Sequence, residues 1–157
     1  MLNTAKKSAR VMNIIHDSIV DGPGLRTVIF FAGCEHRCKG CHNPESWNYQ
    51  NGSEMTVEQI LAEIKANPIT NVTFSGGDPF FQADVVIDLA KLVKDLGKNL
   101  WVYTGYTLEQ IQVNNRYDEL LKYVDVLVDG PFIESEKDYS IDFRGSRNQK
   151  IHYLSPR

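Results

Sequence analysis

The sequence contains no long apolar run and no excess of basic residues. No stretch approaches the roughly 18 consecutive apolar residues that a membrane-spanning helix needs. The basic start of the chain is not followed by the apolar segment of a signal peptide. The net charge is -3, from 17 basic and 20 acidic residues, which argues against a nucleic-acid or membrane surface. We therefore expect a cytoplasmic protein that binds neither nucleic acid nor membrane.

Cysteine is scarce, and its three occurrences are confined to one short segment: Cys34, Cys38 and Cys41. An odd number of cysteines in a cytoplasmic chain argues against a disulfide framework. Cysteines that cluster in this way more often bind a metal or take part in redox chemistry. The three thiols are therefore the first candidates for functional residues.

The length of 157 residues suits one domain with its own core. We find no internal repeat and no low-complexity segment that would divide the chain. We expect a single domain over residues 1–157, in which residues 1–10 form a loose lead-in.

Strand and helix patterns alternate along the chain. Apolar runs rich in β-branched and aromatic residues predict strands, and apolar residues at helical spacing predict helices between them. Thr56 followed by Gln59 forms a capping-box pattern that predicts a helix start. The predicted strands are 27–32, 71–75, 100–103, 124–128 and 151–154, and the later predicted helices are 83–95, 108–112 and 118–123.

This alternation predicts an α/β fold with a mainly parallel sheet. A complete eight-stranded barrel usually needs about 250 residues. We therefore expect a partial, incomplete β/α barrel.

A distinctive loop follows each of the first four predicted strands. The first loop holds the cysteines, and the next three begin Gly76-Gly77-Asp78, Thr104-Gly105-Tyr106 and Asp129-Gly130-Pro131. In parallel α/β folds the carboxyl ends of the strands share one face, and sites are built there. We expect the four loops to converge on one mouth.

The cysteine spacing, Cys-x3-Cys-x2-Cys, favours an iron–sulfur cluster. Thiolates are soft ligands that suit iron. Three thiolates leave one iron of a four-iron cluster open, and an open metal position is typical of a catalytic site. The alternatives are packed free thiols, or a structural Cys3His zinc site with His36 or His42 as the fourth ligand. Zinc sites more often pair two cysteine knuckles, and the sequence has no second one.

With these motifs in view, the chain resembles the radical S-adenosylmethionine enzymes. Within that superfamily it resembles the activating enzymes of anaerobic (class III) ribonucleoside-triphosphate reductase. The matching stretches are Asp21-Gly-Pro-Gly-Leu-Arg26, Gly33-Cys-Glu-His-Arg-Cys-Lys-Gly-Cys-His-Asn43, Ser75-Gly-Gly-Asp-Pro79, Trp101-Val-Tyr-Thr-Gly-Tyr106, Val126-Leu-Val-Asp-Gly130 and Arg144-Gly-Ser-Arg-Asn-Gln149.

The resemblance implies the roles of the site residues. Cys34, Cys38 and Cys41 would ligate three irons of a 4Fe-4S cluster. The amino and carboxylate groups of S-adenosylmethionine would chelate the fourth iron, and Asp78 would accept a hydrogen bond from the ammonium group. The residues implied to bind S-adenosylmethionine are Gly40, Cys41, His42, Gly76, Gly77 and Asp78. No catalytic residue is implied beyond the cluster ligands.

The implied reaction is reductive cleavage of S-adenosylmethionine. An external one-electron donor such as flavodoxin would supply the electron. The resulting 5′-deoxyadenosyl radical would take a hydrogen atom from a glycine of the large subunit of the anaerobic ribonucleoside-triphosphate reductase. The alternatives are activation of another glycyl-radical enzyme and, from a different class, a Cys3His zinc-stabilised binding module.

Overall fold

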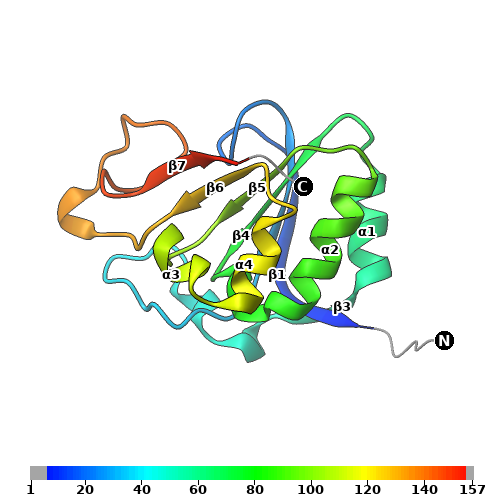
Figure 1. Cartoon of the computed structure of the whole chain (residues 1–157), viewed down its shortest axis with the longest axis horizontal. Coiled ribbons are helices and arrows are strands. Elements are labelled where there is room, and N and C mark those ends of the chain that lie inside the picture. The colour runs from blue at the N-terminus through cyan, green and yellow to red at the C-terminus, as the bar shows by residue number, and fades with distance from the viewer. Residues whose placement is uncertain (1–6, 155–157) are drawn as a thin grey trace.

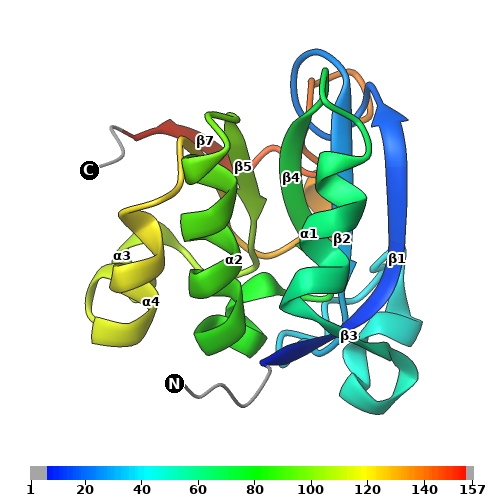
Figure 2. The same cartoon turned by 90° about the vertical axis from the view of Figure 1, so that its right-hand side faces the viewer.

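A seven-stranded sheet runs through residues 7–154, the part of the chain that this computed structural model describes. Its four α-helices lie over one face of the sheet (Figure 1 and Figure 2). The strands are β1 (Ser8–Ser18), β2 (Arg26–Phe31), β3 (Ser53–Thr56), β4 (Asn71–Gly76), β5 (Leu100–Tyr103), β6 (Val126–Asp129) and β7 (Lys150–Tyr153). The helices are α1 (Val57–Lys65), α2 (Ala83–Asp95), α3 (Leu108–Gln112) and α4 (Asn115–Leu121). Over residues 7–154, no helix is both long enough and apolar enough to cross a bilayer.

The centre of the sheet is parallel and its two edges are antiparallel. The strand order is β3-β1-β2-β4-β5-β6-β7. Neighbouring strands from β2 to β6 pair in parallel, whereas β1 runs antiparallel to both β2 and β3, and β7 runs antiparallel to β6. The predicted α/β fold and parallel sheet are therefore confirmed for the four central strands. Closure into a partial barrel stays a prediction.

The sequence pattern missed two strands at one edge. β1 begins at Ser8, so residues 8–10 of the expected lead-in are a strand, and residues 1–6 lie outside the described residues. Only Ala9 and Val11 of β1 are buried, and a register shift after Val11 interrupts its two-residue alternation. β3 is short and no residue in it is buried, so its sequence resembled a loop.

The helices pack on the sheet through one main core. α1 starts at the predicted capping box, in which the Thr56 hydroxyl accepts from the Gln59 amide and the Gln59 side chain accepts from the Thr56 amide. α2 has the bounds that its sequence pattern predicts. A smaller cluster on the opposite, helix-free face contains Trp101, Val126 and Val128. The sheet therefore has one face covered by helices and one face available to the loops.

A buried arginine joins the amino ends of three central strands, β2, β4 and β5. Arg26 is 1% exposed, and its guanidinium donates to the Thr73 hydroxyl at 2.8 Å, the Val72 carbonyl at 2.9 Å and the Pro23 carbonyl at 3.0 Å. It also donates to the backbone carbonyl and the side-chain oxygen of Asn99. Burial lowers the pKa of Arg26 to about 10, so the group stays charged at neutral pH. Arg26 is the first residue of β2, and the cysteines follow the last residue of that strand. Arg26 therefore joins the strands at the end of the sheet opposite the mouth.

Candidate active site

The four loops that follow the parallel strands meet at one end of the sheet, as expected. We call this end, where the carboxyl ends of β2, β4, β5 and β6 lie, the mouth. We call residues 33–47 the cysteine loop; it follows β2. The Asp78 amide, after β4, donates to the Gly33 carbonyl at 2.8 Å and so joins that loop. The loops after β5 and β6 are joined by the Gly130 amide, which donates to the Tyr106 carbonyl at 2.8 Å.

Asp78 is the residue at the mouth that accepts hydrogen bonds from several loops. Its side chain is 1% exposed. One carboxylate oxygen accepts from the Phe80 amide at 2.9 Å, and the other accepts from the Gly105 amide at 2.9 Å and the Thr104 hydroxyl at 2.8 Å. The Nε2 atom of His36 lies 2.7 Å from the second oxygen. One buried carboxylate therefore joins the cysteine loop to the loops after β4 and β5.

His36 reaches Asp78 from the part of the cysteine loop between Cys34 and Cys38. Its side chain is 15% exposed, and its ring packs edge-on against Tyr106 with the ring centres 4.4 Å apart. Burial opposes the charge on this imidazole, but the hydrogen bond to Asp78 and the negative charge of Asp78 outweigh it and raise the pKa of His36. Gly105 leaves room for the ring, because a Cβ there would lie 2.6 Å from the His36 Cδ2 atom. The neighbouring Glu35 accepts a hydrogen bond from the Tyr106 hydroxyl.

The three cysteines lie at different depths in their loop. Cys34 is buried, while Cys38 and Cys41 are half-buried. Burial is the main cause that raises the pKa of the Cys34 thiol to about 11, and the charge of Asp78 adds to it. The Cys41 amide donates to the Cys38 carbonyl at 3.1 Å, so these two residues share one turn. Within residues 7–154, no three His, Cys, Asp or Glu side chains form a group that could hold a single metal ion.

The donor set fits an iron–sulfur cluster better than a zinc ion. In a cubane cluster each thiolate binds a different iron, so the three thiols need not converge on one point. Both candidate histidine ligands have other partners: His36 contacts Asp78, and the Nε2 atom of His42 lies 3.3 Å from the Tyr139 hydroxyl. A thiol that binds metal is deprotonated outright, so loading the site would release the Cys34 proton despite its raised pKa. The assignment of the individual cysteines as ligands stays a prediction.

Gly76 and Gly77 lie at the base of the cysteine loop. Gly76 has a φ of +111, and a Cβ on it would collide with the backbone of Phe31. A Cβ on Gly77 would lie 2.5 Å from the Gly33 carbonyl oxygen and 2.8 Å from that of Ser46. The close approach of backbone to backbone therefore requires both glycines, whether or not a ligand binds there.

The other predicted cofactor residues lie against the segment that follows β6. Gly40 has a φ of +79, and a Cβ on it would lie 2.6 Å from the carboxylate of Glu134. The exposed ring of His42 lies 5.5 Å from that of Phe132 and 6.1 Å from that of Tyr139, and Cys41 lies between Gly40 and His42 in the chain. The predicted cofactor residues thus form two groups, one on each side of the cysteine loop.

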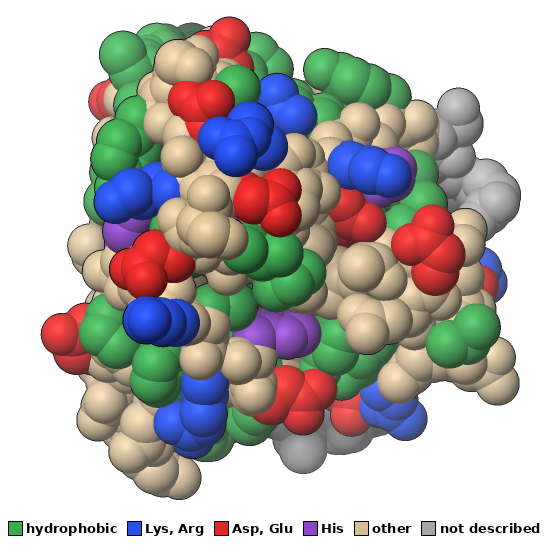
Figure 3. Space-filling model, turned by 90° about the vertical axis from the view of Figure 1, so that its left-hand side faces the viewer, with side chains coloured by type: hydrophobic (Ala, Val, Ile, Leu, Met, Phe, Trp, Pro, Cys, Tyr) green, Lys and Arg blue, Asp and Glu red, His purple; other side chains and the backbone are tan. Residues whose placement is uncertain are grey.

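A cavity of about 580 Å³ lies beside the second group. It is lined by Ile19, Val20, Asp21, His42, Tyr103, Tyr139, Ile141, Asp142, Phe143, Arg144 and Gly145. Figure 3 looks at the side of the molecule that carries the cysteine loop and the segment after β6, and it shows acidic, basic and hydrophobic side chains mixed together. No charge of one sign dominates the approach to the mouth in this view.

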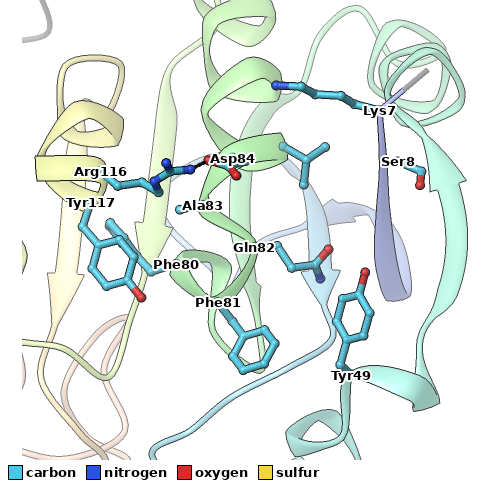
Figure 4. A pocket seen from close by; sticks show the side chains of 11 residues that line it. Lys7, Ser8, Tyr49, Phe80, Phe81, Gln82, Ala83, Asp84, Arg116 and Tyr117 are labelled. Atoms are coloured by element: carbon cyan, nitrogen blue, oxygen red, sulfur yellow. Dashed lines mark ion pairs between the residues drawn. The ribbon is translucent and has the colours of Figure 1, made fainter. Parts of the chain in front are cut away.

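Another cavity, of about 660 Å³, lies at the start of α2 (Figure 4). It is lined by Lys7, Ser8, Tyr49, Phe80, Phe81, Gln82, Ala83, Asp84, Val85, Arg116 and Tyr117. The Gln82 carboxamide in its wall donates to the carbonyls of Arg10 at 2.9 Å and Ala32 at 2.8 Å. Asp84 and Arg116 form an ion pair across its rim (Figure 4). None of the three cysteines lines this cavity, and Gln82 braces β1 against the end of β2 beside the mouth.

Comparison with known proteins identifies the family. The 4Fe-4S single cluster domain family matches residues 20–152. The chain is 41% identical over 143 residues to the anaerobic ribonucleoside-triphosphate reductase-activating protein of Vibrio cholerae. The matched region covers 85% of this chain and 91% of that protein. The chain belongs to the anaerobic ribonucleoside-triphosphate reductase-activating protein family. The member from Escherichia coli (strain K12) is 38% identical over 87% of this chain and 93% of its own length, and the member from Enterobacteria phage T4 is 36% identical over 84% and 86%.

Membership of this activating-protein family confirms the predicted class and cofactors. The chain is a radical S-adenosylmethionine activating enzyme, and its cofactors are a 4Fe-4S cluster and S-adenosylmethionine. Among solved structures, QueE from Escherichia coli matches with a TM-score of 0.54 and 18% identity, over 64% of this chain and 53% of QueE. At this identity the likeness concerns the fold alone.

Two side chains of the mouth have a partner that the sequence did not predict. His36 was expected only as a possible zinc ligand, and Thr104 as part of a strand-end loop that reaches the mouth, without a contact to Asp78. The structure places both side chains on Asp78. A signal was present, because His36 lies between two cysteines and Thr104-Gly105 ends a strand. The pairing itself could not be found without knowing how closely the two loops approach.

Proposed function

We propose that this protein activates an anaerobic ribonucleoside-triphosphate reductase by forming a glycyl radical on its large subunit. The names of the relatives motivate the choice of reductase as partner. Cys34, Cys38 and Cys41 would hold the cluster, which when bound would supply the electron for reductive cleavage of S-adenosylmethionine; the 5′-deoxyadenosyl radical released with methionine would take a hydrogen atom from the glycine Cα and become 5′-deoxyadenosine.

One observation carries the proposal for the site. The only three cysteines of the sequence lie on a loop that meets the Gly76-Gly77-Asp78 loop at the carboxyl ends of parallel strands. Cofactor sites of α/β proteins are usually built at such strand ends. We assign Cys34, Cys38 and Cys41 as the ligands of three irons, and the loops on either side of them as the walls of the S-adenosylmethionine site.

We propose that the two groups of predicted cofactor residues contact different parts of S-adenosylmethionine. Gly76, Gly77 and Asp78 belong to the wall that faces the methionine part, and Cys41 with its neighbours Gly40 and His42 belongs to the wall that faces the adenine. Asp78 already accepts hydrogen bonds from two backbone amides, the Thr104 hydroxyl and His36. An ammonium group of a ligand would therefore reach this carboxylate only in place of one of these donors.

The remaining parts of the proposal concern the surroundings of the enzyme. We propose an external one-electron donor such as flavodoxin, because a reduced cluster needs a supply of single electrons. We place the enzyme in the cytoplasm, where a reducing environment favours free thiols. Nucleic acid and membrane are not among its proposed partners, in keeping with the net charge of -3.

The test is anaerobic electron paramagnetic resonance on the reconstituted, dithionite-reduced protein. We expect a reduced 4Fe-4S signal that changes shape when S-adenosylmethionine is added, and then a glycyl radical on purified reductase. Single replacements of Cys34, Cys38 and Cys41 by Ala should abolish S-adenosylmethionine cleavage. Stoichiometric zinc without a cluster signal would refute the proposal, and cofactor cleavage that leaves no radical on the reductase would refute the choice of partner.

A further inference from the structure

Between its two ends, the cysteine loop is held to the rest of the protein by side chains. Backbone hydrogen bonds fix its two ends together, since the Gly33 amide donates to the Ser46 carbonyl at 2.7 Å and the Cys34 amide to the Trp47 carbonyl at 3.3 Å. Between these ends, the ion pair of Lys39 is long, at 4.0 Å, and the Lys39 side chain is 92% exposed. Such an exposed pair contributes little to holding a loop.

The contact between His36 and Asp78 is different because it is short and buried. The His36 Nε2 atom lies 2.7 Å from the Asp78 carboxylate, and the two side chains are 15% and 1% exposed. The carboxylate is itself fixed by the Phe80 amide, the Thr104 hydroxyl and the Gly105 amide. His36 therefore docks on an acceptor whose orientation the rest of the mouth has already set.

The space for the His36 ring is also shaped by the mouth. Tyr106 packs edge-on against it. Gly105 lies so close that any Cβ would collide with the ring, at 2.6 Å from its Cδ2 atom and 2.9 Å from Nε2. The loop after β5 therefore accommodates His36 in two ways: Gly105 has no side chain to collide with the ring, and the Tyr106 ring packs against it.

We propose that His36 is a positioning residue that ties the segment between Cys34 and Cys38 to Asp78 and so sets the spacing of these two cysteines for the cluster. His36 lies two residues from each of these cysteines, so the point at which it is fastened limits where both thiols can lie. It acts through the loop backbone and touches neither iron nor S-adenosylmethionine. The inference rests on the proposed function, because it assumes that the cysteines hold a cluster.

Three variants of the whole chain separate the parts of this inference. His36→Phe keeps a ring beside Tyr106 but removes the hydrogen bond to Asp78. His36→Gln keeps an N–H donor that can reach Asp78. Gly105→Ala leaves His36 in the chain but pushes its ring away, and because Gly105 has no positive φ the change adds no backbone strain.

The measurements are iron and sulfide content after anaerobic reconstitution, the rate of iron loss to a chelator, and the spectrum of the reduced cluster. We expect His36→Phe and Gly105→Ala to lose iron about tenfold faster than the natural protein, the usual effect of removing a group that orients metal ligands. Their reduced spectra should also change shape. His36→Gln should recover most of the natural rate and spectrum.

Each outcome separates the positioning role from the proposed function. A natural protein that binds no cluster refutes the proposed function and this inference with it. A natural protein that binds a cluster, beside a His36→Phe variant with the same iron loss and spectrum, refutes the inference alone. If His36→Phe fails to fold, Gly105→Ala takes its place in the test. Faster iron loss from Gly105→Ala, beside a natural rate in His36→Gln, then supports the inference, and unaltered iron loss in Gly105→Ala refutes it. Tighter binding of S-adenosylmethionine to His36→Phe would also refute it, because His36 would then be shown to compete with the cofactor for Asp78.

Discussion

Replacing Gly77 with Ala tests whether the base of the cysteine loop depends on close backbone packing. The added Cβ would lie 2.5 Å from the Gly33 carbonyl oxygen and 2.8 Å from that of Ser46. Both neighbours are backbone atoms, so no side-chain rotation relieves the contact. The loop that carries the three cysteines has to move instead.

The size of the effect follows from overpacking a site that cannot relax. Overpacking lowers the free energy of unfolding by about 1–3 kcal/mol, and rigid backbone neighbours favour the upper end. For a chain of this length that corresponds to a loss of roughly 6–12 °C in Tm. We expect thermal unfolding of the cluster-free Gly77→Ala protein to show this shift, and anaerobic reconstitution to give a lower iron content.

Gly97→Ala is the matched control. Gly97 has a φ of +75 and nothing within 4 Å of an added Cβ, so alanine there adds backbone strain without a clash, at about 1 kcal/mol. It lies at the end of α2, away from the cysteines. We expect a small loss of Tm and the natural iron content. If Gly77→Ala also keeps the natural Tm and iron content, the packing argument is wrong.

Three further predictions concern other parts of the molecule. Arg26→Lys should lower the free energy of unfolding by about 3 kcal/mol, because an ammonium group cannot reach all the acceptors that the guanidinium satisfies; urea titration of the cluster-free protein checks this, and an unchanged midpoint would contradict it. Iodoacetamide should label Cys34 last of the three cysteines, because a thiol pKa of about 11 leaves about one thiolate in a thousand near pH 8. The labelling rate of Cys34 should rise as pH approaches that pKa, as mass spectrometry would show, and equal labelling of all three near pH 8 would oppose it. Thr56→Ala should remove the cap of α1 and lower the unfolding free energy by about 1 kcal/mol, while the iron content stays at the natural level.

The sequence predicted those helices and strands whose formation depends on residues close to one another in the chain. The bounds of α2 and β5 were predicted, because helical periodicity and a short apolar run are visible without knowledge of neighbours. The capping box at Thr56 was also predicted from two residues alone. The convergence of the loops followed from the general rule that parallel strands share one carboxyl end.

The features that were missed depend on contacts between distant segments. β1 was missed because its alternation is interrupted and its neighbour β3 lies about 40 residues further along the chain. The docking of His36 on Asp78 joins residues 42 positions apart. It can be found only from the folded chain, in which the cysteine loop packs its backbone against Gly77 and its His36 ring against Gly105.

The Arg26 contacts have a consequence for how the protein responds to its solvent. All five hydrogen bonds of this guanidinium end on carbonyl, amide or hydroxyl oxygens. Dissolved salt weakens attraction between exposed charges, and mild acid removes the charge of carboxylates, but neither changes these uncharged acceptors. The amino ends of β2, β4 and β5 are thus fastened in a way that tolerates changes in ionic strength and acidity, while the opposite end of the same strands carries the ionisable groups of the mouth.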